Sequence, residues 1–187
     1  MPPNVKITKQ DIINTAIDIV RKSGVQAINA RQIASALNCS TQPIFSNFVN
    51  MDELRLEIVK KAEEICGEYI QREINSGKFP DYKASGMAYI RFAKEEKELF
   101  KILYMRDRTN ENISQPSKLD DKMQSFVQKY TGLDEENAKQ FHFGMWAYVH
   151  GIASMIATGF ENPDLDIVSR MLTNVYQGMR KQYEMEQ

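Results

Sequence analysis

The sequence predicts an all-α protein, and three observations support this. Apolar residues recur at i, i+3, i+4 and i+7 along most of the chain, which places them on one face of a helix. No stretch alternates polar and apolar residues over the length of a strand. Many of the periodic stretches begin after Ser, Thr, Asp or Asn and end at Gly, as helices commonly do.

The first predicted helix covers residues 8–23. Thr8 followed by Asp11 is an N-terminal capping pattern, and Gly24 ends the helix because Gly tolerates a left-handed turn. Two short helices follow. Asn29 and Gln32 mark the start of one, Asn38 breaks it, and the other is predicted over residues 40–48, with Ser40 as its cap and Pro43 in its first turn.

Longer helices make up the rest of the chain. Asn50 with Glu53 begins one that runs to about 76–77, and residues 81–105 form another, with a bend near "AKEEKE". Residues 106–116 form a polar loop. Ser117, Asp134 and the segment "ENPD" begin the last three helices, two of which end at Gly132 and Gly159. The total is about nine helices.

Two short helices joined by a tight turn and packed on a third form a helix-turn-helix, here at residues 29–48. The second helix of such a pair enters the major groove of DNA. Residues 1–50 carry five basic and two acidic side chains, a charge of +3, so the other 137 residues of this chain of net charge −1 sum to −4. A basic head on an acidic body favours a polyanionic partner.

Residues 12–54, "IINTAIDIVRKSGVQAINARQIASALNCSTQPIFSNFVNMDEL", resemble the DNA-binding head of the tetracycline-repressor (TetR) family of bacterial regulators. The matching positions, without a gap, are Gly24, Asn29–Arg31, Ile33–Ala34, Asn38–Ser40, Ile44–Phe48 and Asn50–Leu54. Two positions depart from the family pattern. Phe45 stands where the family usually has a Tyr that reaches a phosphate, and Met51 stands where it usually has Lys. We therefore expect weaker binding to the phosphate backbone of DNA and a binding constant that falls only slowly as salt rises.

The resemblance implies a dimeric regulator that binds a palindromic DNA operator and releases it when a small-molecule effector binds. We expect Thr41, Gln42 and Ser46 to contact base edges, since short polar side chains donate and accept there. Arg31, Asn47 and the helix start at Ser40 would hold phosphates. Phe45 would pack against the DNA backbone or a thymine methyl group. The full predicted DNA-binding set is Asn29, Arg31, Gln32, Ser40, Thr41, Gln42, Pro43, Phe45, Ser46 and Asn47.

The predicted helix after Asp134 carries small residues at spacings of 3, 4, 3 and 4, a stripe that lets another backbone approach closely. With the last helix it predicts a four-helix bundle across a two-fold axis. The predicted dimer residues are Gly144, Ala147, Gly151, Ser154, Thr158, Val168, Met171, Val175 and Met179. The segments "WAYVHGIASMIATG" and "YIRFAKEEKELFKILYM" resemble the C-terminal part of the Trp…His-Gly (WHG-type) subgroup of the family.

An effector pocket is implied by the resemblance, and large or polarisable side chains are its candidates: Met87, Tyr89, Tyr104, Met105, Phe143, Trp146 and His150. Met and aromatic residues at helical spacing are also ordinary core residues, so this assignment competes with simple packing.

Enzymatic function is not expected. The sequence has no His-Glu-x-x-His, no Gly-rich phosphate loop, no Gly-x-Ser-x-Gly and no Glu-x-x-His pair for a di-iron site. No apolar run approaches the roughly 20 residues that span a bilayer, the N-terminus lacks a signal-peptide pattern, and Cys39 and Cys66 show no metal or redox spacing. We expect a cytoplasmic protein without a cofactor or membrane partner.

The sequence thus predicts a DNA-binding domain over 1–54 and a helical regulatory, ligand-binding and dimerisation domain over 55–187. The alternative is a helical ligand-binding or protein-interaction module whose DNA binding has been weakened at Phe45 and Met51.

Overall fold

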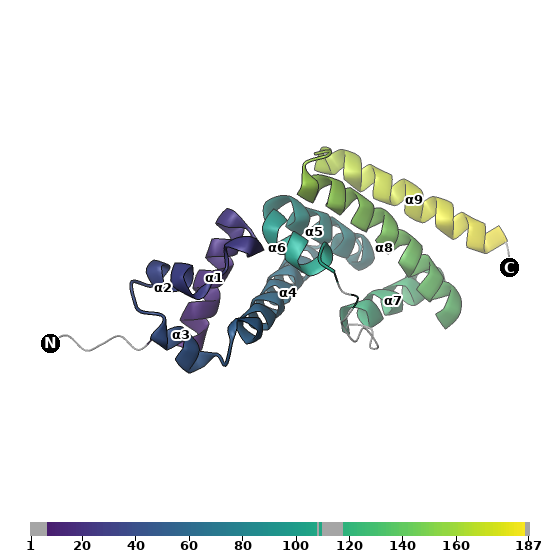
Figure 1. Cartoon of the computed structure of the whole chain (residues 1–187). Coiled ribbons are helices and arrows are strands. Elements are labelled where there is room, and N and C mark those ends of the chain that lie inside the picture. The colour runs from purple at the N-terminus through teal and green to yellow at the C-terminus, as the bar shows by residue number, and fades with distance from the viewer. Residues whose placement is uncertain (1–6, 108, 110–117, 186–187) are drawn as a thin grey trace. The chain divides into compact units, whose positions relative to one another are not determined.

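The computed structural model describes residues 7–107, 109 and 118–185, without the side chains of 118–120. These residues form nine α-helices, one short 3₁₀ helix and no strand, which confirms the all-α prediction (Figure 1). The elements are α1 (Lys9–Ser23), η1 (Val25–Ala27), α2 (Ala30–Ala36), α3 (Gln42–Asn47), α4 (Met51–Asn75), α5 (Asp81–Glu95), α6 (Lys97–Tyr104), α7 (Lys118–Thr131), α8 (Glu135–Thr158) and α9 (Leu165–Met185). Most of the predicted polar loop 106–116 and the predicted start at Ser117 lie outside the described residues.

Several predicted helix signals are confirmed by their hydrogen bonds. The Thr8 hydroxyl accepts the Asp11 N–H while the Asp11 carboxylate accepts the Thr8 N–H, so both members of the capping box are present. The side chain of Asn29 accepts the N–H of Gln32, and that of Asp134 accepts the N–H of Asn137. Each bond satisfies an N–H that the first turn of a helix leaves without an intrahelical partner.

The predicted ends of α3 are wrong, whereas the bend predicted near "AKEEKE" is confirmed as a break between α5 and α6. α3 begins at Gln42, with Thr41 as its N-cap, and ends at Asn47, so it is shorter than the predicted 40–48. The predicted helix 81–105 is interrupted at Glu96, whose backbone has φ −120° and ψ 50°, outside the helical region. The Glu96 carboxylate accepts hydrogen bonds from Nε and Nη2 of Arg21 at 2.9 and 2.7 Å. This ion pair ties the break to α1, which sequence periodicity does not reveal.

The chain divides into two compact units. Unit 1 comprises residues 1–66 and 96–106, and unit 2 comprises residues 67–95 and 107–187. In unit 1, α1 contacts η1, α2, α3 and α6, and its buried face includes Ile12, Ala16 and Val20. The first compact unit therefore extends beyond residue 54. The predicted boundary at residue 54 divides the chain by function, and it stays a prediction.

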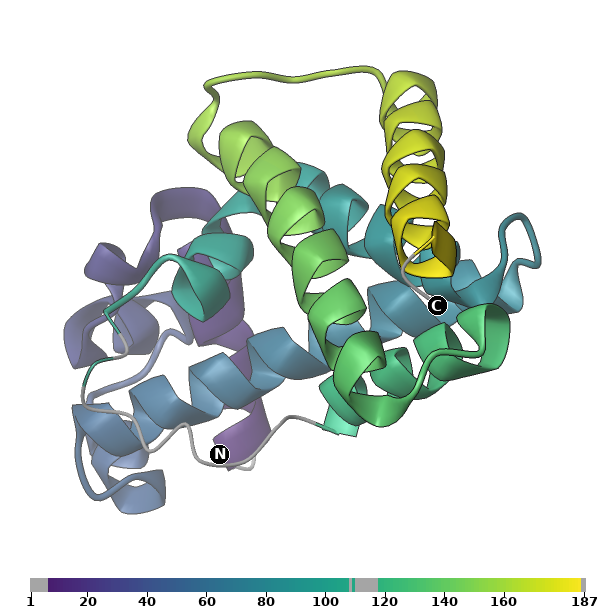
Figure 2. The same ribbon diagram turned by 90° about the vertical axis from the view of Figure 1, so that its right-hand side faces the viewer.

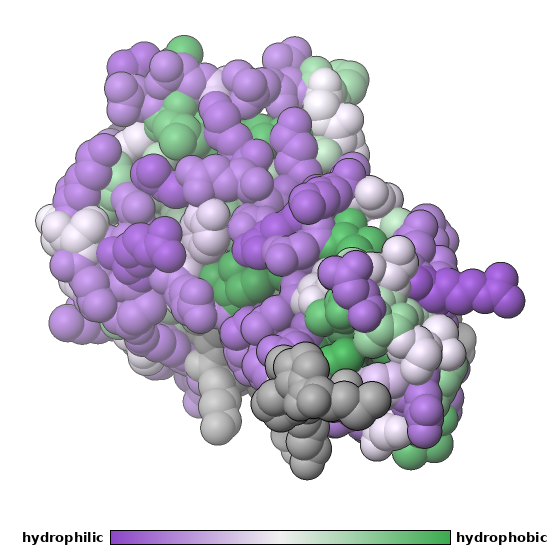
Figure 3. All heavy atoms as spheres, turned by 90° about the vertical axis from the view of Figure 1, so that its left-hand side faces the viewer, coloured by the Kyte–Doolittle hydropathy of each residue, from purple (hydrophilic) through white to green (hydrophobic). Residues whose placement is uncertain are grey.

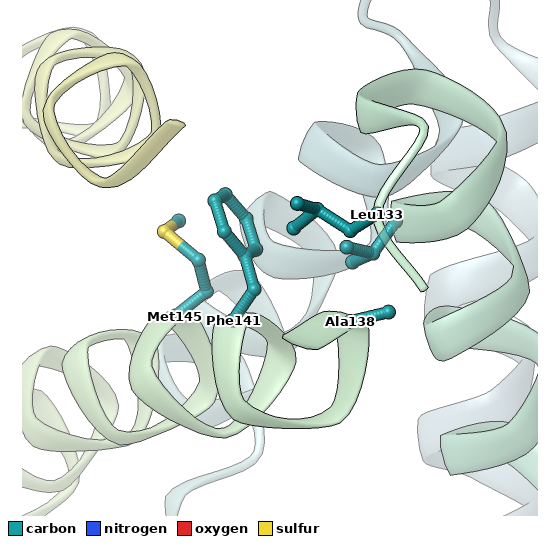
Figure 4. Close-up of a cluster of buried hydrophobic side chains, with 5 residues drawn as sticks. Leu133, Ala138, Phe141 and Met145 are labelled. Carbon is teal, nitrogen blue, oxygen red and sulfur yellow. The ribbon is translucent and has the colours of Figure 1, made fainter. Parts of the chain in front are cut away.

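Unit 2 is built around α8, which packs against α5, α7 and α9. The chain reverses at residues 159–164, and α9 returns antiparallel to α8 (Figures 1 and 2). Phe141 lies at the centre of one buried cluster and points between Leu133 and Met145 (Figure 4). Its ring meets the ring of Tyr176 on α9 edge to face, with 5.3 Å between centroids. The predicted pairing of the last two helices within the chain is confirmed.

None of the helices in the described ranges has the combined length and hydropathy needed to cross a bilayer. On the face shown in Figure 3, hydrophilic side chains predominate, and hydrophobic side chains reach the surface in separate groups.

Candidate nucleic-acid interface and effector unit

α3 is held in unit 1 by two apolar side chains. Ile44, within the helix, is 1% exposed, and Phe48, which follows it, is 2% exposed. Asn38, in the turn before it, has φ 51° and is the only non-glycine residue with positive φ in the described ranges. Asn adopts this left-handed conformation more readily than most residues, as predicted. The turn and the two buried side chains fix which residues of α3 face solvent.

The solvent-facing side of α3 carries Gln42, Phe45 and Ser46, with Ser40 exposed just before the helix. Phe45 is 53% exposed. Thr41, Pro43 and Asn47 are half-buried. The predicted base-contact residues Thr41, Gln42 and Ser46 therefore all reach the surface at least in part.

Two of the predicted DNA-binding side chains also bond within α3. The Ser46 hydroxyl donates to the Gln42 carbonyl at 2.9 Å, and the Asn47 amide donates to the Pro43 carbonyl at 2.8 Å. The Ser46 oxygen keeps acceptor capacity, whereas Asn47 has one of its amide hydrogens committed to the helix. The Ser40 hydroxyl accepts the Gln42 N–H at 3.4 Å, so it supports the turn before the helix.

α2 supplies the remaining predicted contacts. Arg31 and Gln32 are exposed, and Asn29 caps the helix. Among the described residues no carboxylate pairs with Arg31, whereas Arg21 of the same unit pairs with Glu96 and Asp18. An exposed guanidinium without an internal carboxylate is available to a phosphate.

The start of α4 is held firmly next to this surface. The Asn50 side chain accepts the N–H groups of Asp52 and Glu53. The Glu53 carboxylate accepts the Val49 N–H at 2.7 Å and pairs with Lys9 of α1 at 3.3 Å, and these two bonds lower the pKa of Glu53. Glu53 therefore ties α4 to α1 at the end of the helix-turn-helix.

The predicted effector residues fall into three groups. Tyr104 and Met105 belong to unit 1, where the Tyr104 hydroxyl lies 3.7 Å from the Cys66 sulfur. Burial raises the pKa of that thiol to about 11, so Cys66 is not a reactive thiolate. The other five residues belong to unit 2, where Met87 is separate from the group around His150. The sequence could not show this division, because helical periodicity indicates which face of a helix is apolar and not which helices it packs against.

His150 is the centre of a connected polar and aromatic group in unit 2. The Tyr89 hydroxyl lies 2.9 Å from Nδ1 of His150, and the Ser154 hydroxyl lies 3.4 Å from Nε2. The Trp146 ring stacks on the imidazole at 4.8 Å between centroids, and Phe143 stacks on Trp146 at 6.1 Å. Burial lowers the pKa of His150. Phe143 is 67% exposed and Trp146 is 38% exposed, so this group leads from the core to the surface of α8.

Met87 lines a separate hollow of about 380 Å³ in unit 2. Its other lining residues are Lys78, Phe79, Arg91, Lys94, Asp164, Leu165 and Asp166. Nε of Arg91 is buried there without a hydrogen-bond partner. The sequence prediction missed these residues, although Met87, Arg91 and Lys94 follow a helical i, i+4, i+7 spacing that places them on one face of α5.

The predicted dimer residues also separate into inner and outer groups. A Cβ on Gly144 would lie 2.7 Å from the terminal methyl of Met179, so Gly144 faces α9 of its own chain. Val168 is fully buried within the chain. A Cβ on Gly151 would meet nothing within 4 Å, and Ala147 and Thr158 are exposed. Ser154, Met171, Val175 and Met179 are half-buried.

The described residues bring no three His, Cys, Asp or Glu side chains together at a potential metal site.

Comparisons with known proteins agree with this architecture. A member of the TetR family from Streptomyces coelicolor A3 shares the fold with a TM-score of 0.65 and 15% identity, over 89% of this chain and 96% of the other. A TetR-like transcriptional regulator from Rhodococcus sp. RHA1 gives a TM-score of 0.69 at 13% identity, over 98% and 99%. The multidrug binding protein EbrR, complexed with imidazole, gives 0.60 at 14% identity, over 88% and 92%.

No curated protein matches the sequence significantly. A family model described as "Tetracyclin repressor-like, C-terminal domain" matches residues 82–175, which is half of the chain. This match covers part of the predicted regulatory domain, whereas the motif resemblance in the sequence covers residues 12–54. The chain therefore belongs to the TetR family of transcriptional regulators.

Proposed function

We propose that the protein is a repressor that binds a palindromic operator as a homodimer and is released by a small-molecule effector. The observation that carries the proposal is α3: buried Ile44 and Phe48 hold it so that Gln42, Phe45 and Ser46 face outward. The dimer would place two such helices in successive major grooves, about 34–36 Å apart.

Within this proposal, Gln42 and Thr41 donate to and accept from base edges, and Ser46 acts as an acceptor because its hydrogen is bonded within α3. Arg31 contacts a phosphate. Asn47 contributes less than the sequence suggested, since its amide donates to the Pro43 carbonyl. Phosphate contacts set register and affinity, whereas the α3 contacts set sequence preference.

The second copy would pack on the outer side of α8. Ala147, Gly151 and Thr158 form a low, exposed strip, and Phe143 and Met155 expose apolar surface on the same helix. A strip of small residues allows close approach of another helix, and the adjacent large side chains provide apolar area to bury. Gly144 and Val168 would contribute only indirectly, because both already pack inside the subunit.

Effector binding is assigned to unit 2 because it holds two sets of side chains suited to contact a small molecule. One set is the aromatic and polar residues around His150, and the other lines the hollow beside Arg91. The fold neighbour EbrR is a multidrug binding protein, which supports small-molecule binding by this architecture. An effector would act by stabilising a dimer conformation that does not fit the operator. The proposed place of action is the cytoplasm.

The test is a mobility shift of the full-length protein on duplexes from its own upstream DNA, with random DNA as competitor. We expect a shifted band that survives competitor and weakens only modestly as salt rises, because Phe45 and Met51 lack phosphate-binding groups. Gln42→Ala should relax the preference at one base pair in each half-site. Gln26→Ala, which removes another exposed glutamine of the same unit, is the matched control and should leave the preference unchanged.

If the folded, dimeric protein shifts neither upstream nor randomised DNA, the result favours the alternative, a helical interaction module without DNA binding. A specific band that Gln42→Ala does not change would keep the DNA-binding function and remove the assignment of Gln42.

A further inference from the structure

We propose that α3 reads A·T base pairs and that Phe45 detects the 5-methyl group of a thymine. The inference rests on the proposed DNA-binding function and goes further, because it names the base pairs that the helix recognises and the side chain that distinguishes thymine from the other bases.

The surface proposed to read the bases carries no charged side chain. No charged side chain lies between Arg31 and Asp52, a stretch that contains the turn and all of α3. Arg and Lys make the commonest specific contacts with guanine, and Asp and Glu accept from the amino group of cytosine. α3 has neither kind of side chain, so it lacks the strongest readers of a G·C pair.

Phe45 is exposed between two buried apolar side chains. Within six residues the chain places three large apolar side chains: Ile44 and Phe48 are buried, and Phe45 is 53% exposed. No aromatic or cationic partner contacts its ring in the described part of the chain. Because about half of the Phe45 side chain is exposed, covering the rest of it by a partner would gain on the order of 1 kcal/mol. An apolar ring at this place on a reading helix therefore has surface to bury when a partner arrives.

The major groove presents an apolar group that such a ring can contact. The thymine methyl is the apolar group at a base edge in that groove, and Phe is among the side chains that contact it. Phe45 has no hydroxyl, so it cannot hydrogen-bond a phosphate as a Tyr would. Contact with a methyl group therefore explains an exposed Phe better than contact with the charged backbone does.

Gln42 supplies the complementary polar contact. It is exposed and lies three residues before Phe45, so the two side chains are neighbours on one face of α3. The Gln amide pairs in a bidentate manner with N6 and N7 of adenine. An amide for adenine next to an apolar ring for a thymine methyl matches adjacent A·T pairs, with Thr41 and Ser46 able to contact either base.

The experiment has two stages. Full-length protein selects duplexes from a randomised library, and binding to the selected sequence is measured by fluorescence anisotropy. Each thymine of one half-site is then replaced by deoxyuridine, which removes only the methyl group. We expect one thymine per half-site at which the replacement weakens binding by about three- to tenfold, as expected for one buried methyl group.

Variants of Phe45 assign the effect. Phe45→Ala should weaken binding to the thymine duplex and remove the difference between thymine and deoxyuridine at that position, because the contacting ring is gone. Phe45→Tyr keeps the ring and should keep the difference. Gln42→Ala is the matched control: it should relax the preference for adenine while the thymine–deoxyuridine difference remains.

Each outcome has a distinct meaning. A selected half-site whose α3-contacted pairs are G·C, or one in which no deoxyuridine replacement changes affinity, overturns this inference while leaving the DNA-binding function intact. A thymine effect that persists in Phe45→Ala removes Phe45 as the reader of the methyl group. If no sequence is selected at all, the proposed function fails first, and this inference fails with it.

Discussion

The two units expose apolar side chains in different ways. In the helix-turn-helix of unit 1, one ring stands exposed on a six-residue helix, between two buried neighbours. In unit 2, α8 exposes Phe143 and Trp146 in a stacked row beside a strip of small residues. An isolated ring suits contact with a small group such as a methyl, whereas a continuous apolar strip suits another helix. The difference supports the proposal that unit 1 contacts DNA and unit 2 contacts a second subunit.

The sharpest test of the isolated ring compares Phe45, within α3, with Phe48, directly after it. Phe48→Ala should lower the free energy of unfolding by about 3–5 kcal/mol, because it leaves a cavity under α3. Phe45→Ala should change it by no more than about 0.5 kcal/mol, since the ring already faces water. Chemical denaturation of both variants measures the difference. Equal losses would mean that Phe45 is part of the core and is not a free reading residue.

The exposed strip on α8 is tested by a substitution at Gly151. Gly151→Arg should weaken the dimer by at least about thirtyfold, because a charge buried without a partner costs roughly 2 kcal/mol or more. The subunit itself should stay folded, since nothing lies within 4 Å of a Cβ at this position. Analytical ultracentrifugation measures dimer dissociation.

Gly144→Ala is the matched control. Its Cβ would press on Met179 of the same chain, so the free energy of unfolding should shift by up to about 1 kcal/mol, because the strain is partly offset by the better helix propensity of Ala. Dimer affinity should not change. A dimer insensitive to Gly151→Arg would move the interface away from this strip.

The smallest expected effect concerns His150, where the exposed aromatic row reaches the core. Burial lowers the pKa of His150 below its ordinary value of 6.5, so the folded chain favours the neutral ring. As the pH falls below about 6.5, the unfolded chain takes up the proton first, and the free energy of unfolding decreases. At higher pH both states are neutral, and this loss is absent.

Replacing His150 by Gln should remove this part of the pH dependence while keeping a group that can accept from Tyr89. Denaturation at pH 5.5 and 7.5 at one protein concentration would show a smaller difference in the variant than in the parent. The same pH dependence in both proteins would exclude His150 as its source.

Much of unit 1 could be predicted from sequence because its signals are local. Caps at Thr8 and Asn29 and the positive φ of Asn38 each depend on a few neighbouring residues, and all three are present in the structure. The neutral character of α3 is likewise a property of the sequence alone. The predicted range 40–48 for α3 was too long at both ends, since the helix covers Gln42–Asn47 after its N-cap Thr41, although the Ser40 hydroxyl does accept the Gln42 N–H.

In unit 2, local signals were not enough. Periodicity showed that α8 is apolar around most of its circumference, but it could not show which side of it faces α5, α9 or solvent. Gly144 and Gly151 look equivalent in the sequence, yet one faces Met179 and the other faces open space. The bond between Tyr89 and His150 joins residues 61 positions apart, and no pattern of spacing encodes it.

The sequence by itself determined the all-α class, most helix starts, the helix-turn-helix and the absence of charged residues between Arg31 and Asp52. These follow from backbone preferences and side-chain chemistry that act over a few residues. Only the tertiary structure decided that Glu96, at the bend predicted from the sequence, pairs with Arg21, that Phe45 is exposed while Phe48 is buried, and that Gly151 faces outward. The physical reason is that burial and ion pairing between distant segments depend on how helices pack, and a helical repeat fixes faces without fixing neighbours.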